Sequence, residues 1–315
     1  MTTAVNATLA GSRPFFTLTP LGALVGNLGA GAKNLFSGFD PDAVITALFA
    51  SGEQGVFFDP SDLSTMFQES TGITPVTADG QPVGLILDKS KGLVLGPELV
   101  TNGDFSNGST GWTLGTGWTV SGGAAISAGG SQFQSVMQNI ITVTGTIYKI
   151  TLDVTYTSGS LLIRLGGGTN LAEIGSSGSK TYYLRAEGTG ITFLCNATGY
   201  EFVGSIDNIS VKELPGNHGV QSNAALKPAL RYSPYRIDYD AVDDTIVSTF
   251  ASSLGTNCTV CRAVAGVGAN ILTAQTIGTS YSDSTDHCGL IVIDRALTAG
   301  ETSDVTAYLN AKAGV

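Results

Sequence analysis

Cysteine and histidine residues in the last third of the sequence have types and a spacing that could bind a metal ion. Two residues separate Cys258 from Cys261, and His287 and Cys288 follow later in the chain. Zn²⁺ binds such thiolates and imidazoles. The two intervening residues are threonine and valine, which extend a strand, and positions three apart in a strand point to opposite faces. We therefore favour cysteines packed as small hydrophobic side chains, with zinc and a disulfide as the alternatives.

The densest group of carboxylates is formed by Asp238, Asp240, Asp243 and Asp244. A glycosidase would use two of them as a paired acid and base. Asp238 and Asp240 instead alternate along a predicted strand, and the other two end it at a turn, where aspartate makes local hydrogen bonds. We favour this structural role. Calcium bound here or by residues 282–286 is a second hypothesis, because loops that present hard oxygen ligands suit calcium.

Catalytic motifs are missing from the sequence. Neither His218 nor His287 lies in a triad-like motif, and there is no nucleophile elbow. The glycines at 166–168 lack the Gly-Lys-Ser/Thr order of a phosphate-binding loop and are predicted to form a turn. We therefore expect no enzymatic activity and no catalytic residue.

Composition favours an all-β protein of one large or two ordinary domains. Of 315 residues, 42% are hydrophobic, which allows buried cores. Charged residues make up only 13% and glycines number 42, a balance typical of short strands joined by turns. The net charge of −10, without a cluster of lysine and arginine, excludes nucleic acid as an expected partner.

Targeting segments are not expected from the sequence. No apolar run is long enough to cross a bilayer, and the N-terminal 30 residues lack a basic segment and contain Pro14 and Pro20. We therefore expect neither membrane insertion nor a signal peptide. Four cysteines are too few for a disulfide scaffold in so long a chain, which is compatible with folding in a reducing cytoplasm.

Helical patterns occur only near the two ends. Asp40-Pro41 would begin a short helix that Gly52 ends. Thr298 and Glu301 form the capping box of a final helix. Residues 1–39 are rich in Gly, Ala and Thr and show neither the helical nor the strand period, so we predict that residues 1–52 form an irregular N-terminal docking arm with one short helix.

Between residues 99 and 214 the sequence predicts strand after strand. β-Branched or aromatic residues alternate with polar ones and glycine-containing turns follow, as in IITVTGTIYKITLDVTYTSG, KTYYLRAEG and FVGSIDNISVKEL. This pattern favours a β-sandwich or jelly roll. After residue 215, RIDYDAVDDTIVSTF and TNCTVCRAV predict further strands, and the nearly all-apolar GLIVIDRAL predicts an inner strand buried on both sides.

The segments that flank this region resemble the concanavalin-like (laminin-G-like) jelly rolls. VFFDPSDLSTMFQESTG, LILDKSKG, NHGVQSNAALKPALRY and RIDYDAVDDTIVSTF follow that family's order, but residues 99–214 separate the second segment from the third. The resemblance implies two jelly-roll domains, one inserted in the other. The laminin-G-like domain would comprise residues 53–98 and 215–315, and the insert residues 99–214.

The insert resembles the jelly-roll carbohydrate-binding modules. The opening motif of that family is matched by Asn102, Gly103, Phe105, Gly108, Gly111 and Trp112, and its closing motif by IDNISV around Asp207. The resemblance implies a structural calcium ion, with Asp104 and Asp207 as candidate ligands and no other cofactor. Ser106 stands where the family has an acidic residue.

Aromatic residues of the insert are the candidates for glycan binding, because a flat ring can stack on the apolar face of a sugar. Trp118 lies in the glycine-flanked stretch GTGWTVSGG, where its ring could stay exposed, and Tyr156 and Tyr182 are the further candidates. Trp112 belongs to the family's structural opening, so we expect it in the core. A core position is the alternative for Trp118 as well.

The outer segments GEQGVFFDPSDLSTMFQESTGITPVTADGQPVGLILDKS and DHCGLIVIDRALTAGETSDVTAYLNAKAGV resemble structural proteins of tailed bacteriophages and prophages. This resemblance implies a non-enzymatic virion protein, a tail fibre, spike or head appendage, that folds in the host cytoplasm and lies on the virion surface. Its expected partners are other virion proteins through the arm, further copies in a homo-oligomer such as a trimer, and host surface glycans. A capsid decoration protein without ligand binding and a glycan-cleaving enzyme are the alternatives.

Overall fold

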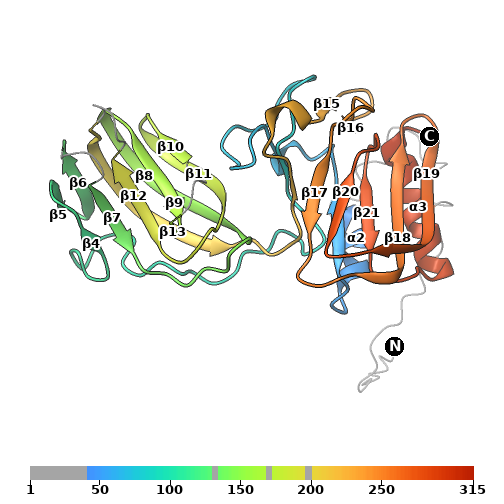
Figure 1. Cartoon of the computed structure of the whole chain (residues 1–315), viewed down its shortest axis with the longest axis horizontal. Helices are drawn as coiled ribbons and strands as arrows, with labels where there is room; N and C mark the ends of the chain where they lie inside the picture. The colour runs from blue at the N-terminus through green and yellow to red at the C-terminus, as the bar shows by residue number, and fades with distance from the viewer. Residues whose placement is uncertain (1–40, 130–133, 168–171, 196–200) are drawn as a thin grey trace, which may run out of the picture. The chain divides into compact units, whose positions relative to one another are not determined.

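The computed structural model describes residues 41–129, 134–167, 172–195 and 201–315 (Figure 1). Contacts divide the chain into Met1–Asp40 and Pro41–Val315, and the described fold is that of the second unit. Residues 1–40 of the predicted docking arm therefore lie outside the described residues. The all-β prediction is confirmed, because four antiparallel sheets of four or five strands make up most of the described chain.

Residues on both sides of the insert form one antiparallel sandwich. Its first sheet has the order β1 (Gly55–Phe58), β21 (Leu290–Ile293), β18 (Gly255–Val264), β19 (Gly268–Ile277). Its second sheet has the order β2 (Met66–Phe67), β3 (Leu85–Ile86), β14 (Gly219–Val220), β17 (Ile246–Thr249), β20 (Ser280–Asp283). Both sheets thus combine strands that precede the insert with strands that follow it.

The predicted inner strand in GLIVIDRAL is confirmed as β21. All four residues of β1 and all four of β21 are buried, because the second sheet covers one face of these strands and helices cover the other. Strands covered on both faces have no polar side of their own, which explains the unbroken apolar sequences GVFF and LIVI.

Helix α3 (Ala299–Ala313) packs on the outer face of the first sheet (Figure 1). It begins at the predicted capping box, in which Thr298 and Glu301 exchange side-chain and backbone hydrogen bonds. It ends at Gly314, whose φ of +80° is the left-handed conformation that glycine adopts most easily. Val305, Tyr308 and Leu309 are buried against the sheet, as their spacing on one helix face requires.

Helix α2 (Pro41–Thr46), which continues as the 3₁₀ turn η2 (Ala47–Phe49), packs in the same layer. Ile45, Leu48 and Phe49 are buried in one cluster with Phe57 and Val305. The predicted helix is present, but assigning it to an arm that ends at residue 52 is wrong. Its apolar stripe is covered by the sandwich, so this segment belongs to the folded domain.

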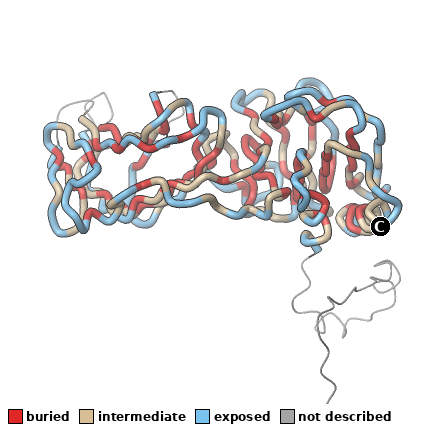
Figure 2. The backbone as a smooth tube through the Cα atoms, turned by 90° about the horizontal axis from the view of Figure 1, so that it is seen from below, coloured by how far each residue is buried: buried red, intermediate tan, exposed pale blue. Residues whose placement is uncertain are grey.

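The insert is a second sandwich with its own core. One sheet has the order β10 (Ala172–Ile174), β9 (Leu161–Leu165), β12 (Ile191–Cys195), β7 (Ser135–Gln138), β4 (Thr113–Leu114). The other has the order β11 (Gly178–Arg185), β8 (Ile147–Ser158), β13 (Val203–Glu213), β6 (Ala124–Ala128), β5 (Trp118–Ser121). Buried positions alternate with half-buried ones along the central strands β8 and β9, and the buried ones belong to one apolar cluster (Figure 2).

Short elements complete the described chain. The hairpin β15 (Ala229–Arg231) and β16 (Arg236–Asp238) precedes β17, and η3 (Leu63–Thr65) and η4 (Ala224–Leu226) are single 3₁₀ turns. The strand predicted over 236–250 is thus split into β16 and β17 by a turn. Among the described residues no helix has the length and apolar character needed to span a membrane.

Candidate functional site

The two points where the chain enters and leaves the insert are held together by the buried carboxylate of Asp88. The backbone N–H groups of Phe57, Ser90 and Asn217 each donate to it at 2.8 Å, and the Ser90 hydroxyl donates as well. Asp88 and Asn217 lie on opposite sides of the insert in the sequence. One buried acceptor therefore joins the two halves of the flanking sandwich.

His218 completes this junction through hydrogen bonds to two backbone groups. Its Nδ1 accepts from the Asp88 backbone N–H at 2.9 Å, so Nε2 carries the proton and donates to the Leu214 carbonyl at 3.0 Å. Burial lowers the pKa of His218, which keeps the imidazole neutral. Both ring nitrogens are hydrogen-bonded to backbone groups, so the imidazole has a structural role at this junction.

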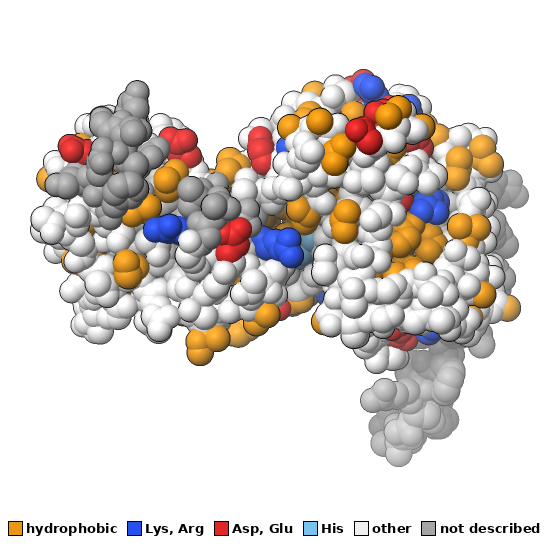
Figure 3. Space-filling model, viewed as in Figure 1, with side chains coloured by type: hydrophobic (Ala, Val, Ile, Leu, Met, Phe, Trp, Pro, Cys, Tyr) orange, Lys and Arg blue, Asp and Glu red, His pale blue; other side chains and the backbone are white. Residues whose placement is uncertain are grey.

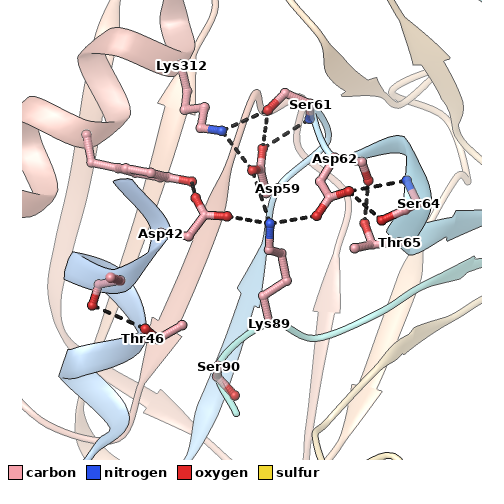
Figure 4. A network of polar contacts seen from close by, with 12 residues as sticks. Asp42, Thr46, Asp59, Ser61, Asp62, Ser64, Thr65, Lys89, Ser90 and Lys312 are labelled. Carbon is pink, nitrogen blue, oxygen red and sulfur yellow. Dashed lines mark hydrogen bonds and ion pairs between the residues drawn. The ribbon is translucent and has the colours of Figure 1, made fainter. Parts of the chain in front are cut away.

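A network of two lysines and three aspartates ties the helices to the first sheet (Figure 4). Lys89 contacts Asp42 and lies 2.8 Å from Asp62 and 3.5 Å from Asp59, while Lys312 lies 2.7 Å from Asp59. Burial lowers the pKa of Lys89, but its hydrogen bonds to Asp42 and Asp62 outweigh burial and raise the pKa overall. The carboxylates are engaged by permanent cations, so this cluster is structural.

The cysteines are packed as predicted. Among the described residues all four are buried free thiols. Cys258 lies in the core between the sheets, whereas Cys261 and Cys288 face the helices, so Cys258 and Cys261 point to opposite faces of β18. Burial raises the pKa of each of these thiols. This arrangement cannot direct Cys258 and Cys261 at one metal ion.

The aspartates around residue 240 form the predicted turn. Asp240 accepts hydrogen bonds from the backbone N–H groups of Val242, Asp243 and Asp244, while Asp238 pairs with Arg231 and Arg236. The carboxylates of Asp240, Asp243 and Asp244 come within 4.8 Å of one another, the one such group among the described residues. Calcium at this group stays a hypothesis.

Residues 282–286, the second segment considered for calcium, include an aspartate that is buried inside the protein. Asp283 is buried and binds His287, Arg262 and the Tyr239 hydroxyl, and Asp286 accepts from the Tyr239 backbone N–H. The Asp283 carboxylate is therefore already engaged inside the protein and does not face a loop. The prediction of calcium ligation by this segment is wrong for Asp283.

Asp104 and Asp207, the calcium ligands implied by the resemblance, have local partners. Asp104 is exposed and accepts from the backbone N–H and hydroxyl of Ser106, and Asp207 accepts from the Asn208 backbone N–H at 2.6 Å. Among the described residues neither aspartate belongs to a group of three ligands. Calcium at this position stays a prediction.

The expectation that the Trp118 ring is exposed and stacks on a sugar is wrong, because the ring is buried. It is 5% exposed and lies parallel to Phe202, with ring centroids 5.9 Å apart. Trp118 is the first residue of β5, and its side chain takes the inward position of the strand. Tyr182 is likewise in the core at 4% exposure, and Tyr156 packs against the core and donates its hydroxyl to the Gly159 carbonyl.

Trp112 is in the core, as predicted. Its Nε1 donates to the Asn102 carbonyl at 3.0 Å, and its ring contacts Phe105 and Phe193. The glycan-binding candidates taken from the sequence are therefore mostly interior residues. The outward-facing side chains of the insert are therefore the remaining candidates for a ligand surface.

The outer face of the sheet β10-β9-β12-β7-β4 offers such a surface. Thr113, Met137, Thr192 and Arg164 follow one another across four strands in direct register. Met137 is 40% exposed, and Arg164 has no hydrogen-bond or ion-pair partner among the described residues. We call these four residues the cross-strand row. Their outward positions follow from strand alternation, but the strand order that joins them is not visible in the sequence.

Charge on the molecule is sparse. The face shown in Figure 3 consists mostly of neutral side chains, with acidic and basic groups scattered singly or in small groups. No broad basic patch is present on this face. The exclusion of nucleic acid as an expected partner rests on the net charge of −10 and stays a prediction.

Comparisons with known proteins concern the fold. No known protein family and no curated protein matches the sequence. The carbohydrate-binding module TmCBM61, solved with β-1,4-galactotriose, is similar over 36% of this chain and 97% of its own, at 15% identity and a TM-score of 0.26. The tandem CBM22 domains of Xyn10C from Paenibacillus barcinonensis are similar over 66% of this chain and 94% of theirs, at 10% identity and a TM-score of 0.31.

A third solved structure, an oxalate decarboxylase, is similar over 60% of this chain and 78% of its own, at 6% identity and a TM-score of 0.14. Two of these three neighbours are carbohydrate-binding modules, and the described part of this chain forms β-sandwiches.

Proposed function

We propose that this protein is a non-enzymatic structural protein of a tailed-bacteriophage virion and that its inserted sandwich binds host surface glycans. The flanking segments support the virion role through their resemblance to phage proteins. The observation that carries the glycan role is the cross-strand row, in which the exposed Thr113 and Met137 and the half-buried Thr192 and Arg164 lie in register across four strands. A capsid decoration protein without ligand binding is the second candidate.

The cross-strand row combines the contacts that a sugar chain needs. The Met137 side chain supplies apolar surface for the face of a ring, the two threonine hydroxyls can donate and accept hydrogen bonds, and the Arg164 guanidinium carries several donors. So small a surface implies weak binding at each copy. A homo-oligomer, which we propose to be a trimer on the virion surface, would raise the avidity.

We expect Arg164→Ala and Met137→Ala each to weaken binding of the full chain to host surface polysaccharide by about tenfold, because each removes a group of the row. Binding is measured on a polysaccharide array or by surface plasmon resonance. Lys149→Ala is the matched control, since Lys149 lies on the opposite sheet, between the buried Tyr148 and Ile150. Equal losses in all three variants would contradict the assignment of the row.

The polysaccharide-binding assay also distinguishes the glycan-binding protein from the two alternatives, a capsid decoration protein and a glycan-cleaving enzyme. A chain that binds none of the host polysaccharides supports the decoration protein. Release of shorter sugars from the bound polysaccharide supports the enzyme instead.

Deleting residues 1–40 tests the docking role of the N-terminal segment. The deletion stops before residue 41, because residues 41–49 pack in the flanking sandwich and are needed for its core. We expect a soluble chain with an unchanged melting temperature that no longer joins particles, since the deletion leaves the described cores intact. Incorporation is measured by labelling purified virions. Normal incorporation of the truncated chain would exclude the docking role of this segment.

A further inference from the structure

The flanking sandwich is open along one side, between the edge strands of its two sheets. Among the described strands β19 pairs only with β18, and β20 pairs only with β17. A cavity of about 220 Å³ lies between these edges. Its lining includes Arg262 from β18, Leu272 and Gln275 from β19, and Ser280, Tyr281 and Ser282 from β20. We call this cavity the edge cavity.

Arg262 is the charged group of the edge cavity. Its side chain is 12% exposed, and Nη2 donates to the Tyr281 hydroxyl and lies 3.2 Å from Oδ1 of Asp283. Its Nε is buried and has no hydrogen-bond partner among the described residues. A guanidinium has five N–H donors, so the described protein leaves part of this donor capacity unused.

Asp283 is the one carboxylate of the described chain that pairs with Arg262, and it also accepts hydrogen bonds from two other groups. Its Oδ2 accepts from the Tyr239 hydroxyl and from Nε2 of His287, each at 2.8 Å. The bond to Arg262 is the longest of the three. The buried guanidinium is thus only partly compensated, and buried donors without a partner are uncommon in native proteins.

The other residues that line the edge cavity restrict the kind of ligand that could bind to Arg262. Ser280, Ser282 and Gln275 present neutral hydroxyl and amide groups, and Leu272, 41% exposed, presents apolar surface at the rim. A dry cavity of about 150 Å³ accepts benzene, so the edge cavity, at about 220 Å³, has room for one substituted six-membered ring. A single guanidinium in a chain of net charge −10 favours a monoanion over a polyanion.

We propose that the edge cavity binds the carboxylate of a sugar acid through Arg262, with the sugar hydroxyls on Gln275, Ser280 and Ser282 and the ring against Leu272. The carboxylate accepts from the guanidinium and supplies the anionic partner that Asp283 supplies only in part. This site is on the flanking sandwich and is independent of the cross-strand row of the insert. It therefore goes beyond the proposed function and can stand if that function fails.

Methyl β-D-glucuronide is the probe, titrated into the full chain and followed by NMR or calorimetry. We expect saturable binding that weakens as salt is added, because the contact is an ion pair. Methyl β-D-glucoside should bind at least about tenfold more weakly, since it lacks only the carboxylate. Equal binding of the two sugars would overturn the proposal. So would binding of inorganic phosphate without binding of the glucuronide, which would mean a general anion site.

Leu272→Trp should fill the edge cavity from its rim and reduce glucuronide affinity by at least about tenfold without removing Arg262. Thr273→Trp is the matched control, because Thr273 is the next residue of β19, is exposed and does not line the cavity. Arg262→Gln should abolish binding. Unchanged affinity in Leu272→Trp, an equal loss in Thr273→Trp, or full affinity in a folded Arg262→Gln variant would each overturn the proposal.

Discussion

Replacement of Trp118 by alanine should destabilise the inserted sandwich by about 3–5 kcal/mol, the range observed when a large buried aromatic residue is removed. The Trp118 ring is 5% exposed and stacks on Phe202, and it belongs to the core cluster of the insert. Its removal leaves a cavity that the surrounding strands cannot fill. The free energy of unfolding is measured by denaturant titration, with fluorescence of the remaining Trp112 as the probe.

Thr119→Ala is the matched control for Trp118→Ala. Thr119 follows in the same strand and is exposed, so we expect a change below about 0.5 kcal/mol. Polysaccharide binding by the folded fraction of Trp118→Ala should be unchanged. A variant that keeps its stability and loses binding would restore Trp118 as a ligand-binding residue.

Asp88→Ala should destabilise the flanking sandwich by about 3 kcal/mol or more. The substitution removes the carboxylate and leaves the buried backbone N–H groups of Phe57 and Ser90 and the half-buried one of Asn217 without a partner. Each buried unsatisfied group costs about 1–3 kcal/mol. The measurement is the midpoint and slope of unfolding in urea. The effect should extend to both halves of the sandwich, because Asn217 lies beyond the insert.

Two further variants show how much of the stability change in Asp88→Ala is due to the buried carboxylate. Asp88→Asn keeps one acceptor oxygen but turns an amide toward one of the donors, so we expect an intermediate loss. Asp79→Ala removes an aspartate whose side chain is 52% exposed, and its effect should stay below about 1 kcal/mol. Equal stability of Asp79→Ala and Asp88→Ala would mean that the junction does not depend on the buried carboxylate.

Features that depend on neighbours in the chain could be predicted from the sequence. The capping box of Thr298 and Glu301 is made by residues three apart, and the turn at Asp240 by residues two to four apart. The alternation along β18 also placed Cys258 and Cys261 on opposite faces. Such features need no knowledge of the tertiary fold, because the hydrogen bonds and the strand period are local.

The role of Trp118 could not be predicted in this way. A shift of one residue in strand register moves every side chain to the other face, and a glycine-flanked segment does not reveal its register. In the structure Trp118 pairs with Ser127 and points inward. The same ring one position later would have faced solvent.

The candidate sites depend on the order of strands in space. The sequence by itself indicated the caps and many of the strands, because these follow local patterns. The prediction that one sandwich interrupts another rested on the order of motifs that resemble two families. Only the tertiary structure brought together Thr113, Met137, Thr192 and Arg164 from four strands, and Arg262 with Asp283 from two sheets. These contacts arise from pairing and packing between distant segments, which depend on the burial of the whole core and leave no local pattern.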